Sequence, residues 1–329
     1  MAGYTDSAFR QICRESGADI VMTELISADA IYHNKNVKAQ ISPVSPEASR
    51  GGNVKRKVGE LLDSDKTLSL MKFCEAERPI VIQLFGKYPE KFAFAAKWVM
   101  ENLKPDGIDI NMGCPARKVV GSDHGAALLK NPKLAIEIVQ AVREQIEIPL
   151  SVKIRLGWEN DDEILKLAPE LVKAGIDAII IHGRTYRDGF KNQSRWKNIY
   201  ETKKLINYKL KSGCAVIGNG DVKGYEEAIE KSESNGVKLD GIAIGRAAFG
   251  KPQVFQNLKP QISNLKYKDL ILKHAKLAYQ TKGNHGIIEF RKHLLAYTKG
   301  LPDAKKLRAE AVKIVSVEDV EGIVKKFIN

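Results

Sequence analysis

Cysteine is scarce in this chain, and its spacing suits neither a metal site nor a disulfide framework. The 329 residues contain four cysteines, Cys13, Cys74, Cys114 and Cys214, and no two of them form a C-x-x-C pair. This spacing excludes a cysteine-based zinc site and argues against a set of disulfides. We therefore expect a reduced, cytoplasmic protein that holds no metal ion.

Long apolar runs are missing as well. No segment approaches the roughly 18 apolar residues of a membrane span, and the first residues show no signal-peptide pattern. We therefore expect no contact with a membrane. The chain contains 43% hydrophobic and 28% charged residues, which is ordinary for a globular protein and excludes wholesale disorder. Its length fits one large domain and a smaller one.

The net charge of +13 is unevenly distributed along the chain. Residues 257–329 contain 15 Lys and Arg against 7 Asp and Glu, and residues 33–60 contain 6 against 2. The remaining residues are nearly neutral, with 32 against 31. Solvated helix faces often carry excess lysine, but its concentration in two segments favours a polyanionic partner such as nucleic acid.

Short apolar runs typical of buried strands alternate with amphipathic runs typical of helices. The expected strands are Asp19–Thr23, Pro79–Leu84, Gly107–Ile110, Leu150–Ile154, Ala178–Ile181, Ala215–Gly218 and Gly241–Ile244. The clearest helical runs between them are Pro89–Glu101, Pro132–Glu144, Asp161–Ala174 and Tyr225–Ser232. An eighth strand results if Met1–Gly3 is the end of one. This alternation predicts an α/β fold, a (β/α)8 TIM barrel of parallel strands.

Most of these strands end in a polar residue that an apolar core would reject. The residues are Glu24, Gln83, Asn111, Lys153 with Arg155, His182, Asn219, and the pair Gly245-Arg246. Each of them alone has a simple explanation, because a strand must reach solvent somewhere. In a barrel, however, the C-terminal ends of the strands meet at one mouth, where the active site is built. The seven positions together predict an active site there.

Cys114 follows one of these strands directly, in the stretch Asp109–Pro115. We expect Asn111 and Gly113 to turn the chain and Pro115 to stiffen the loop that presents the thiol. A lone cysteine is usually a small buried hydrophobe. A thiol is nevertheless the most reactive side chain here when solvent and a partner can reach it. Cys114 is therefore our candidate catalytic residue.

Two glycine-containing turns indicate a phosphate site, and a lysine indicates a flavin. The first turn is Gly218-Asn219-Gly220-Asp221, and the second is Gly245-Arg246. Glycine frees backbone N–H groups for a phosphate, and Arg246 adds a planar positive group. Lys153 at a strand end would offset charge on a reduced flavin, which favours FMN. A Schiff-base aldolase is the competing chemistry for a strand lysine.

The motifs of this chain resemble those of the tRNA-dihydrouridine synthases, particularly the bacterial subgroup close to the nitrogen-regulation-type proteins. The matching stretches are Met1-Ala2-Gly3-Tyr4-Thr5-Asp6, Gln83-Leu84-Phe85-Gly86, Asn111-Met112-Gly113-Cys114-Pro115, Val152-Lys153-Ile154-Arg155, Ile181-His182-Gly183-Arg184-Thr185, Gly218-Asn219-Gly220-Asp221, Ile244-Gly245-Arg246 and Arg291-Lys292-His293. The resemblance runs over nearly the whole length. The cysteine motif followed by His-Gly-Arg-Thr is highly specific.

The resemblance implies an activity, cofactors and site residues. Members of the family reduce the C5–C6 double bond of uridine in tRNA with FMN, which NADPH recharges. By this resemblance Cys114 would protonate C5, and the target base would have to leave its stack. The residues that match cofactor contacts are Gln83 and Lys153 at the flavin ring, His182 beside it, Met1 and Ala2 under it, and Asn219, Gly220, Asp221, Gly245 and Arg246 on the phosphate side.

The resemblance also implies two domains. Residues 1–257 would form the FMN-binding barrel, with an insertion at about 34–57 that we expect to be a basic surface loop. Residues 258–329 would form a small all-helical domain that binds tRNA. Its lysines and arginines would contact phosphates, which supply affinity but little base discrimination. We expect the protein to be a monomer.

Two other functions stay open at this point. An FMN-dependent barrel oxidoreductase acting on a dihydroorotate-like small molecule would use the same flavin residues, but it leaves the basic C-terminal segment without a purpose. A non-catalytic RNA-binding protein on a degenerate barrel predicts a damaged site. Cys114, Lys153 and both glycine turns are intact, which favours the enzyme.

Overall fold

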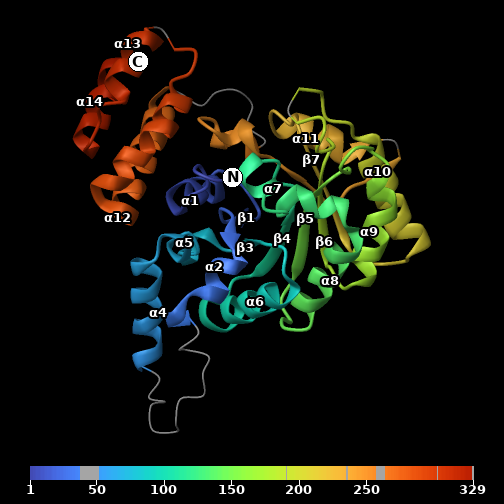
Figure 1. The fold of residues 1–329 in the computed structure, drawn as a ribbon. Helices are drawn as coiled ribbons and strands as arrows, with labels where there is room; N and C mark the ends of the chain where they lie inside the picture. The colour runs from blue at the N-terminus through green and yellow to red at the C-terminus, as the bar shows by residue number, and fades with distance from the viewer. Residues whose placement is uncertain (38–51, 190, 235, 257–263, 302, 328–329) are drawn as a thin grey trace.

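The computed structural model describes residues 1–37, 52–189, 191–234, 236–256, 264–301 and 303–327. A curled parallel sheet lies at its centre, helices cover the outside of the sheet, and the C-terminal helices lie together at one side (Figure 1). This confirms the predicted barrel-like α/β fold followed by helices. None of the helices in these ranges is long and apolar enough to cross a membrane.

The sheet has the strand order β1-β3-β4-β5-β6-β7-β10, and all its neighbours are parallel. The strands are β1 (Val21–Met22), β3 (Ile80–Phe85), β4 (Gly107–Met112), β5 (Leu150–Arg155), β6 (Ala178–His182), β7 (Ala215–Asn219) and β10 (Gly241–Ala243). The short β2 (Ile26–Ser27) also pairs with β3, further along it than β1 does. β1 and β2 therefore share one position in the sheet.

Met1–Gly3, which would have supplied the end of an eighth strand, forms no strand. The amides of Tyr4 and Thr5 both donate to the Met1 carbonyl, at 3.0 and 3.2 Å, and close a turn. Gly3 has a φ of +76°, a left-handed conformation that belongs to turns and not to strands. Among the described residues no ladder joins β10 to β1, so the sheet is open at this edge.

Helices follow most strands and begin or end at recognisable residues. Those of the barrel are α1 (Ser7–Glu15), α2 (Ala28–His33), α4 (Gly52–Ser64), α5 (Lys66–Ser69), α6 (Pro89–Leu103), α7 (Arg117–Val120), α8 (Pro132–Arg143), α9 (Glu163–Lys173), α10 (Lys197–Lys204) and α11 (Tyr225–Ser232). A proline occupies the first turn of α6 and of α8, where its missing N–H costs nothing. Asn131 caps α8 by accepting from the Leu134 amide at 3.2 Å.

Shorter elements complete the barrel. They are the 3-10 helices η2 (Glu75–Glu77), η3 (Gly125–Lys130), η5 (Arg246–Ala248) and η6 (Pro252–Phe255), the π-helical turn η4 (Leu205–Lys209), and the two-stranded hairpin β8 (Glu233–Ser234) and β9 (Val237–Lys238). η3 begins beside Cys114, whose carbonyl accepts from the Ala126 amide, and η5 begins at Arg246. Both therefore start beside candidate site residues.

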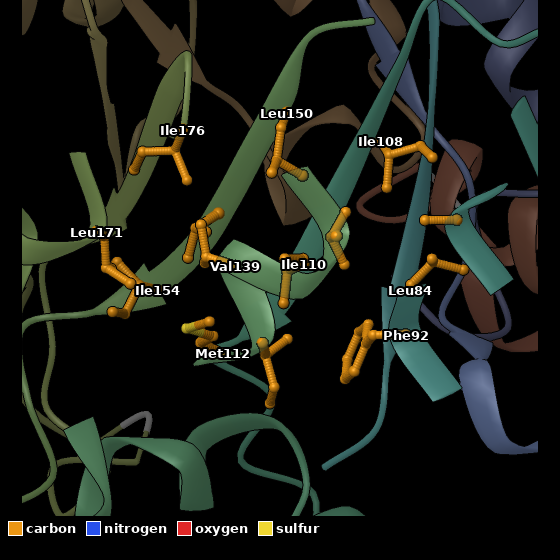
Figure 2. Close-up of a cluster of buried hydrophobic side chains, with 14 of the residues drawn as sticks. Leu84, Phe92, Ile108, Ile110, Met112, Val139, Leu150, Ile154, Leu171 and Ile176 are labelled. Carbon is orange, nitrogen blue, oxygen red and sulfur yellow. The ribbon is translucent and has the colours of Figure 1, made fainter. Parts of the chain in front are cut away.

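The main hydrophobic core lies between the sheet and its surrounding helices. Along β4, Ile108, Ile110 and Met112 are fully buried and pack with Phe92 of α6 and Val139 of α8 (Figure 2). Successive side chains of a strand point to opposite faces, so the residues between these three belong to the inner face of the sheet. Burial of each such side chain contributes about 1.5–3 kcal/mol. This packing fixes the strands and the inner-face residues with them.

The predicted basic loop at 34–57 is wrong for its last part. Residues 52–57 are the beginning of α4, and residues 38–51 lie outside the described residues. Further along this helix Val58, Leu61 and Leu62 are buried in the main core. An amphipathic run that can bury one face is stabilised as a helix by that packing.

The C-terminal helices have a second core of their own. They are α12 (Asn264–Tyr297), α13 (Ala304–Ala311) and α14 (Val317–Phe327). α12 is bent at Gly283, whose φ and ψ are 58° and −146°. Its buried residues Ile271, Phe290 and Leu294 pack with the other two helices, and Ala8 of α1 belongs to the same cluster. Thus α12 packs directly on α1, and α13 and α14 pack on α12 (Figure 1).

Candidate active site

The polar residues predicted at the mouth share the inner face of the sheet. The registers pair Gln83 with Asp109, Asn111 with Lys153, Arg155 with His182, and His182 with Asn219. Within β4 and β5, Asp109, Asn111, Lys153 and Arg155 alternate with apolar residues that face the helices. The period of two therefore gathers side chains from five neighbouring strands on one surface.

Asp109 is the centre of a buried hydrogen-bond network. Its carboxylate accepts from Gln83 Nε2 and from Ser151 Oγ, both at 2.6 Å. Asn111 Nδ2 donates to Gln83 Oε1 at 3.1 Å, so the orientation of the Gln83 amide is fixed at both ends. Burial raises the pKa of Asp109 to about 7, although both hydrogen bonds and the nearby Lys153 act in the opposite direction.

The loop that carries Cys114 is held from two sides. The expectation that Asn111 turns the chain is wrong, because Asn111 lies inside β4. Its Oδ1 accepts from the amides of Gly113 and Cys114, at 3.3 and 3.0 Å. Arg155 Nε donates to the Gly113 carbonyl at 2.8 Å. The amide of Ala126 donates to the Cys114 carbonyl at 3.1 Å. The Cys114 backbone is thus fixed just past the end of β4.

Cys114 differs from the other three cysteines in its surroundings. Its side chain is half-buried and free of any disulfide. Cys13 and Cys214 are buried, and burial raises the pKa of each thiol to about 12. Cys74 is exposed and precedes η2, away from the strand ends. Of the four cysteines, Cys114 has the position and access that a reactive thiol needs.

Lys153 and Asn219 connect β5 with β7. Lys153 Nζ donates to Asn219 Oδ1 at 3.2 Å, and Asn219 Nδ2 donates to the Ala243 carbonyl at 2.6 Å. Burial lowers the pKa of Lys153 to about 8, with Arg155 adding to this effect and Asp109 opposing it. Lys153 is therefore mostly protonated at neutral pH, and its ammonium group is held in one direction.

His182 is a neutral imidazole in this setting. Burial, together with the positive charges of Lys153, Arg155 and Arg184, lowers the pKa of His182 to about 2. Arg184 Nη1 lies 3.2 Å from His182 Nε2. Because a guanidinium can only donate, Nε2 accepts and Nδ1 carries the proton. His182 can thus serve as a hydrogen-bond donor through Nδ1.

The predicted phosphate side contains an acid between two arginines. Asp221 accepts from Arg184 Nη2 at 2.6 Å and from the Ser194 amide at 3.0 Å, and its other oxygen accepts from Arg246 Nη2 at 3.2 Å. Asp221 thereby orients both arginines, so a phosphate contact of Asp221 would have to come from its backbone. A carboxylate would otherwise repel the phosphate.

On the same phosphate side, the backbone of Gly220 lies very close to the buried side chain of Ser194. Gly220 has a φ of +127°, and a Cβ there would lie 2.3 Å from Ser194 Oγ, so a larger residue does not fit. Ser194 Oγ is buried and lies near the Asp221 carboxylate, but it forms no hydrogen bond of normal geometry within the described residues. An anionic group that accepts from Ser194 would satisfy this donor.

Met1, Ala2 and Gly245 are placed less tightly. A Cβ at Gly245 would lie 3.4 Å from Met1 Sδ, an ordinary contact, so Met1 is next to the second glycine turn. Ala2 is exposed in the N-terminal turn, and no hydrogen bond of the described residues joins it to the other candidates. The roles of these and of the other candidate residues stay predictions.

Sequence reasoning missed several members of the site. The network centre Asp109, its partner Ser151, the paired Arg184 and the buried hydroxyl of Ser194 were not assigned roles. Ser151 and Asp109 could have been found, because they lie two residues before Lys153 and Asn111 and so share their face. Ser194 precedes α10 in an irregular segment, for which the sequence gives no periodic signal.

Known proteins match this chain over nearly its whole length. The sequence model of the family described as dihydrouridine synthase (Dus) matches residues 1–328. A protein of Aquifex aeolicus named probable tRNA-dihydrouridine synthase is 33% identical, over 99% of this chain and 92% of its own. The tRNA-dihydrouridine synthase B of Pseudomonas syringae pv. tomato is 30% identical over 100% and 90%. With the match running from the N-terminal turn through α14, this chain belongs to the dihydrouridine synthase family.

Proposed function

We propose that this protein is a tRNA-dihydrouridine synthase that reduces the C5–C6 double bond of uridine in tRNA, with FMN as its bound cofactor and NADPH as reductant. The observation that carries the proposal is that a half-buried thiol, a fixed ammonium group and a neutral imidazole lie together at the C-terminal ends of neighbouring strands. The full-length family match and the names of the relatives support the same reaction.

The residues of the inner face support FMN as the cofactor. Gln83 and Lys153 would hold the ring, since their polar groups are already oriented by Asp109, Asn111 and Asn219. Gly220, Gly245 and Arg246 would hold the phosphate, beside the buried Ser194 hydroxyl, which forms no hydrogen bond of normal geometry and could donate to a phosphate oxygen. When bound, FMN supplies the two electrons and the hydrogen that C6 of the uracil ring receives.

Cys114 would supply the proton that C5 needs to complete the reduction. The S–H bond breaks, a C5–H bond forms, and the thiol is left as a thiolate. Lys153 and Arg155 lie close enough to Cys114 for their charges to interact with it. Because Cys114 is only half-buried, water can return the proton after each turnover.

The C-terminal helices would bind the tRNA backbone. The segment 257–329 carries 15 Lys and Arg against 7 Asp and Glu, and helices α12 to α14 extend from the side of the barrel on which α1 lies (Figure 1). Contacts to phosphates would position the tRNA while one uridine leaves its stack to enter the mouth. The rim of the mouth, and not these helices, would then recognise the base.

The decisive experiment is single-turnover oxidation of the reduced, FMN-loaded protein. We expect tRNA transcripts lacking dihydrouridine to reoxidise the flavin and to acquire dihydrouridine in equal amount. If orotate or another small pyrimidine reoxidises the flavin and tRNA does not, the small-molecule oxidoreductase is the correct function. If neither substrate reacts although tRNA binds, the protein is a non-catalytic RNA-binding barrel.

A further inference from the structure

Three side chains that can bind a metal ion lie close together where α12 packs against α1. They are Asp6, which precedes α1, and His274 and His293, which belong to the two halves of α12 on either side of its bend. One potential ligand atom of each lies within 4.8 Å of the other two. His274 and His293 are 0% and 1% exposed, so both imidazoles are enclosed by protein.

The ring nitrogens of this cluster lack the partners that buried polar atoms normally have. Of the four, only His274 Nδ1 has a hydrogen-bond contact, 3.0 Å from Tyr297 Oη. His274 Nε2 and both nitrogens of His293 are buried without a partner among the described residues. The Tyr4 backbone is near His293 but forms no hydrogen bond of normal geometry. Each unpaired buried group costs about 1–3 kcal/mol, so three together require an explanation.

The walls of the cluster cannot supply those partners, because they are aromatic. The ring of His293 stacks on Phe9 at a centroid distance of 5.0 Å, and His274 lies edge-on to Phe290 at 4.9 Å. The two imidazoles are 4.6 Å apart. Apolar walls around converging lone pairs are the surroundings of a metal site and are costly for imidazoles that have no ligand.

Asp6 can contribute a ligand atom without giving up its structural role. One of its carboxylate oxygens accepts from the Phe9 amide at 2.9 Å and caps α1. A carboxylate has a second oxygen with its own lone pairs. Two neutral imidazoles and one carboxylate form a donor set that binds Zn²⁺ and similar divalent ions.

We propose that Asp6, His274 and His293 form a zinc-type metal site that ties the C-terminal helices to α1. Three atoms at most 4.8 Å apart leave an ion at most about 2.8 Å from each, and zinc bonds are about 2.0–2.2 Å long, so side-chain shifts under 1 Å close the site. Water would take the fourth position. Tyr297, holding the second nitrogen of His274, is the outer partner that metal-bound histidines usually have.

The protonation states agree with this geometry. Burial lowers the pKa of His293 to about 4 and that of His274 well below its usual value. Both rings are therefore neutral at pH 7, the form that binds metals. Our expectation of no metal rested on cysteine spacing alone, and it did not consider ligands that are 268 and 19 positions apart in the sequence.

The site goes beyond the proposed activity, because it concerns how the two cores are joined. A bound ion would add its binding free energy to the folded state and hold α12 at a fixed angle to α1. The mouth of the barrel and the helices that would bind tRNA would then keep one relative position, independently of whether FMN is bound.

The test uses the full-length protein after removal of metals with a chelator. Zinc sulfate should bind at one ion per chain by elemental analysis and should raise the melting temperature. Cobalt(II) in place of zinc should give the visible absorption of a four-coordinate site. Asp6→Asn keeps an oxygen to cap α1 but loses the charge, and it should weaken zinc affinity by about tenfold or more. His293→Gln should weaken it further.

The matched control is His285→Gln. His285 lies on α12 as well, but its side chain is 70% exposed and it lies 3.3 Å from Glu289, so its loss should leave zinc binding unchanged. Absence of stoichiometric zinc in the wild type would overturn the proposal. So would equal zinc affinity in the wild type and a folded Asp6→Asn protein, or loss of binding in His285→Gln. Because the His293 variant risks misfolding, Asp6→Asn is decisive.

Discussion

At the scale of single residues, the role of the Cys114 thiol can be tested independently of flavin binding and flavin reduction. Cys114→Ala should still bind FMN and accept electrons from NADPH, because neither step uses a proton on C5. Reduction of tRNA uridine should fall about 10²–10⁴-fold, the usual contribution of a positioned acid. Stopped-flow reoxidation of the reduced flavin by tRNA measures this loss.

The other cysteines provide the controls for that experiment. Cys74→Ala changes an exposed thiol and should leave both reoxidation and stability unchanged. Cys13→Ala and Cys214→Ala remove buried thiols and should lower stability only. Reoxidation of Cys114→Ala at the wild-type rate would exclude the thiol from the reaction.

The lowered pKa of Lys153 predicts that a rise in pH above 8 has opposite effects on folding stability and on flavin affinity. Its pKa is about 8 in the folded protein against 10.5 as its usual value, so the folded state loses this proton first. Between pH 8 and 10.5 the unfolded chain binds more protons, and the stability of the FMN-free protein should rise with pH. Flavin affinity should fall over the same range, by about tenfold or 1.4 kcal/mol, as the positive charge is lost.

Lys153→Met separates these effects from the titration of other groups. Both slopes above pH 8 should disappear in the variant, whose flavin affinity should be low at all pH values. Fluorescence quenching of FMN and urea unfolding between pH 7 and 10 are the measurements. A Lys153→Met protein with the wild-type slopes would show that another group is titrating.

At the scale of an element, the strand β4 and its loop act as one unit. Asn111 joins them, since it donates to Gln83 within the barrel and accepts from the amides of Gly113 and Cys114 in the loop. Asn111→Ala should cost about 1–3 kcal/mol in unfolding free energy, because it leaves the buried Gln83 oxygen unpaired. It should also slow uridine reduction, since the thiol is no longer held.

A second asparagine offers a matched comparison. Asn102 Nδ2 donates to the Trp98 carbonyl at 2.8 Å on α6, away from the mouth. Asn102→Ala should affect stability alone, with reoxidation by tRNA at the wild-type rate. If the two variants lose reoxidation rate equally, Asn111 has no special role in positioning Cys114.

At the scale of the whole molecule, most of the positive net charge lies in the C-terminal segment and not in the barrel. The C-terminal segment holds +8 of the net +13, so tRNA affinity should fall steeply with salt as counterions are released. Lys299 and Lys305 are exposed in this segment, and Lys97 and Lys133 are exposed on α6 and α8. Replacing the first pair by glutamine should lower the salt slope by about 1 per lost phosphate contact.

The same change at Lys97 and Lys133 alters the net charge equally and should leave tRNA binding unchanged. Filter binding between 50 and 300 mM salt compares the two double variants. Equal losses would mean that binding depends on net charge and not on the C-terminal helices. These substitutions are preferable to removal of residues 258–329, which would uncover Ala8 of α1.

The sequence alone determined the strand series and the polar set at its C-terminal ends. Apolar residues at every second position of β4 and β5 predict both the strands and the face on which Lys153 and Asn111 lie, because side chains alternate in a strand. Cys114 could be placed just past β4 for the same reason. The motifs from Met1 to Arg246 were sufficient to predict the family, which the comparisons confirmed.

Only the tertiary structure decided what depends on contacts between distant segments. Whether Met1–Gly3 forms a strand or a turn depends on which groups its carbonyls meet, and local periodicity says nothing about that. The beginning of α4 is helical in part because the helix buries Val58 and Leu61. Strand register brings Asp109 within hydrogen-bond distance of Gln83 and Ser151. Helix packing brings Asp6 close to His274 and His293. Such partners are set by the fold of the entire chain, so no local pattern could predict them.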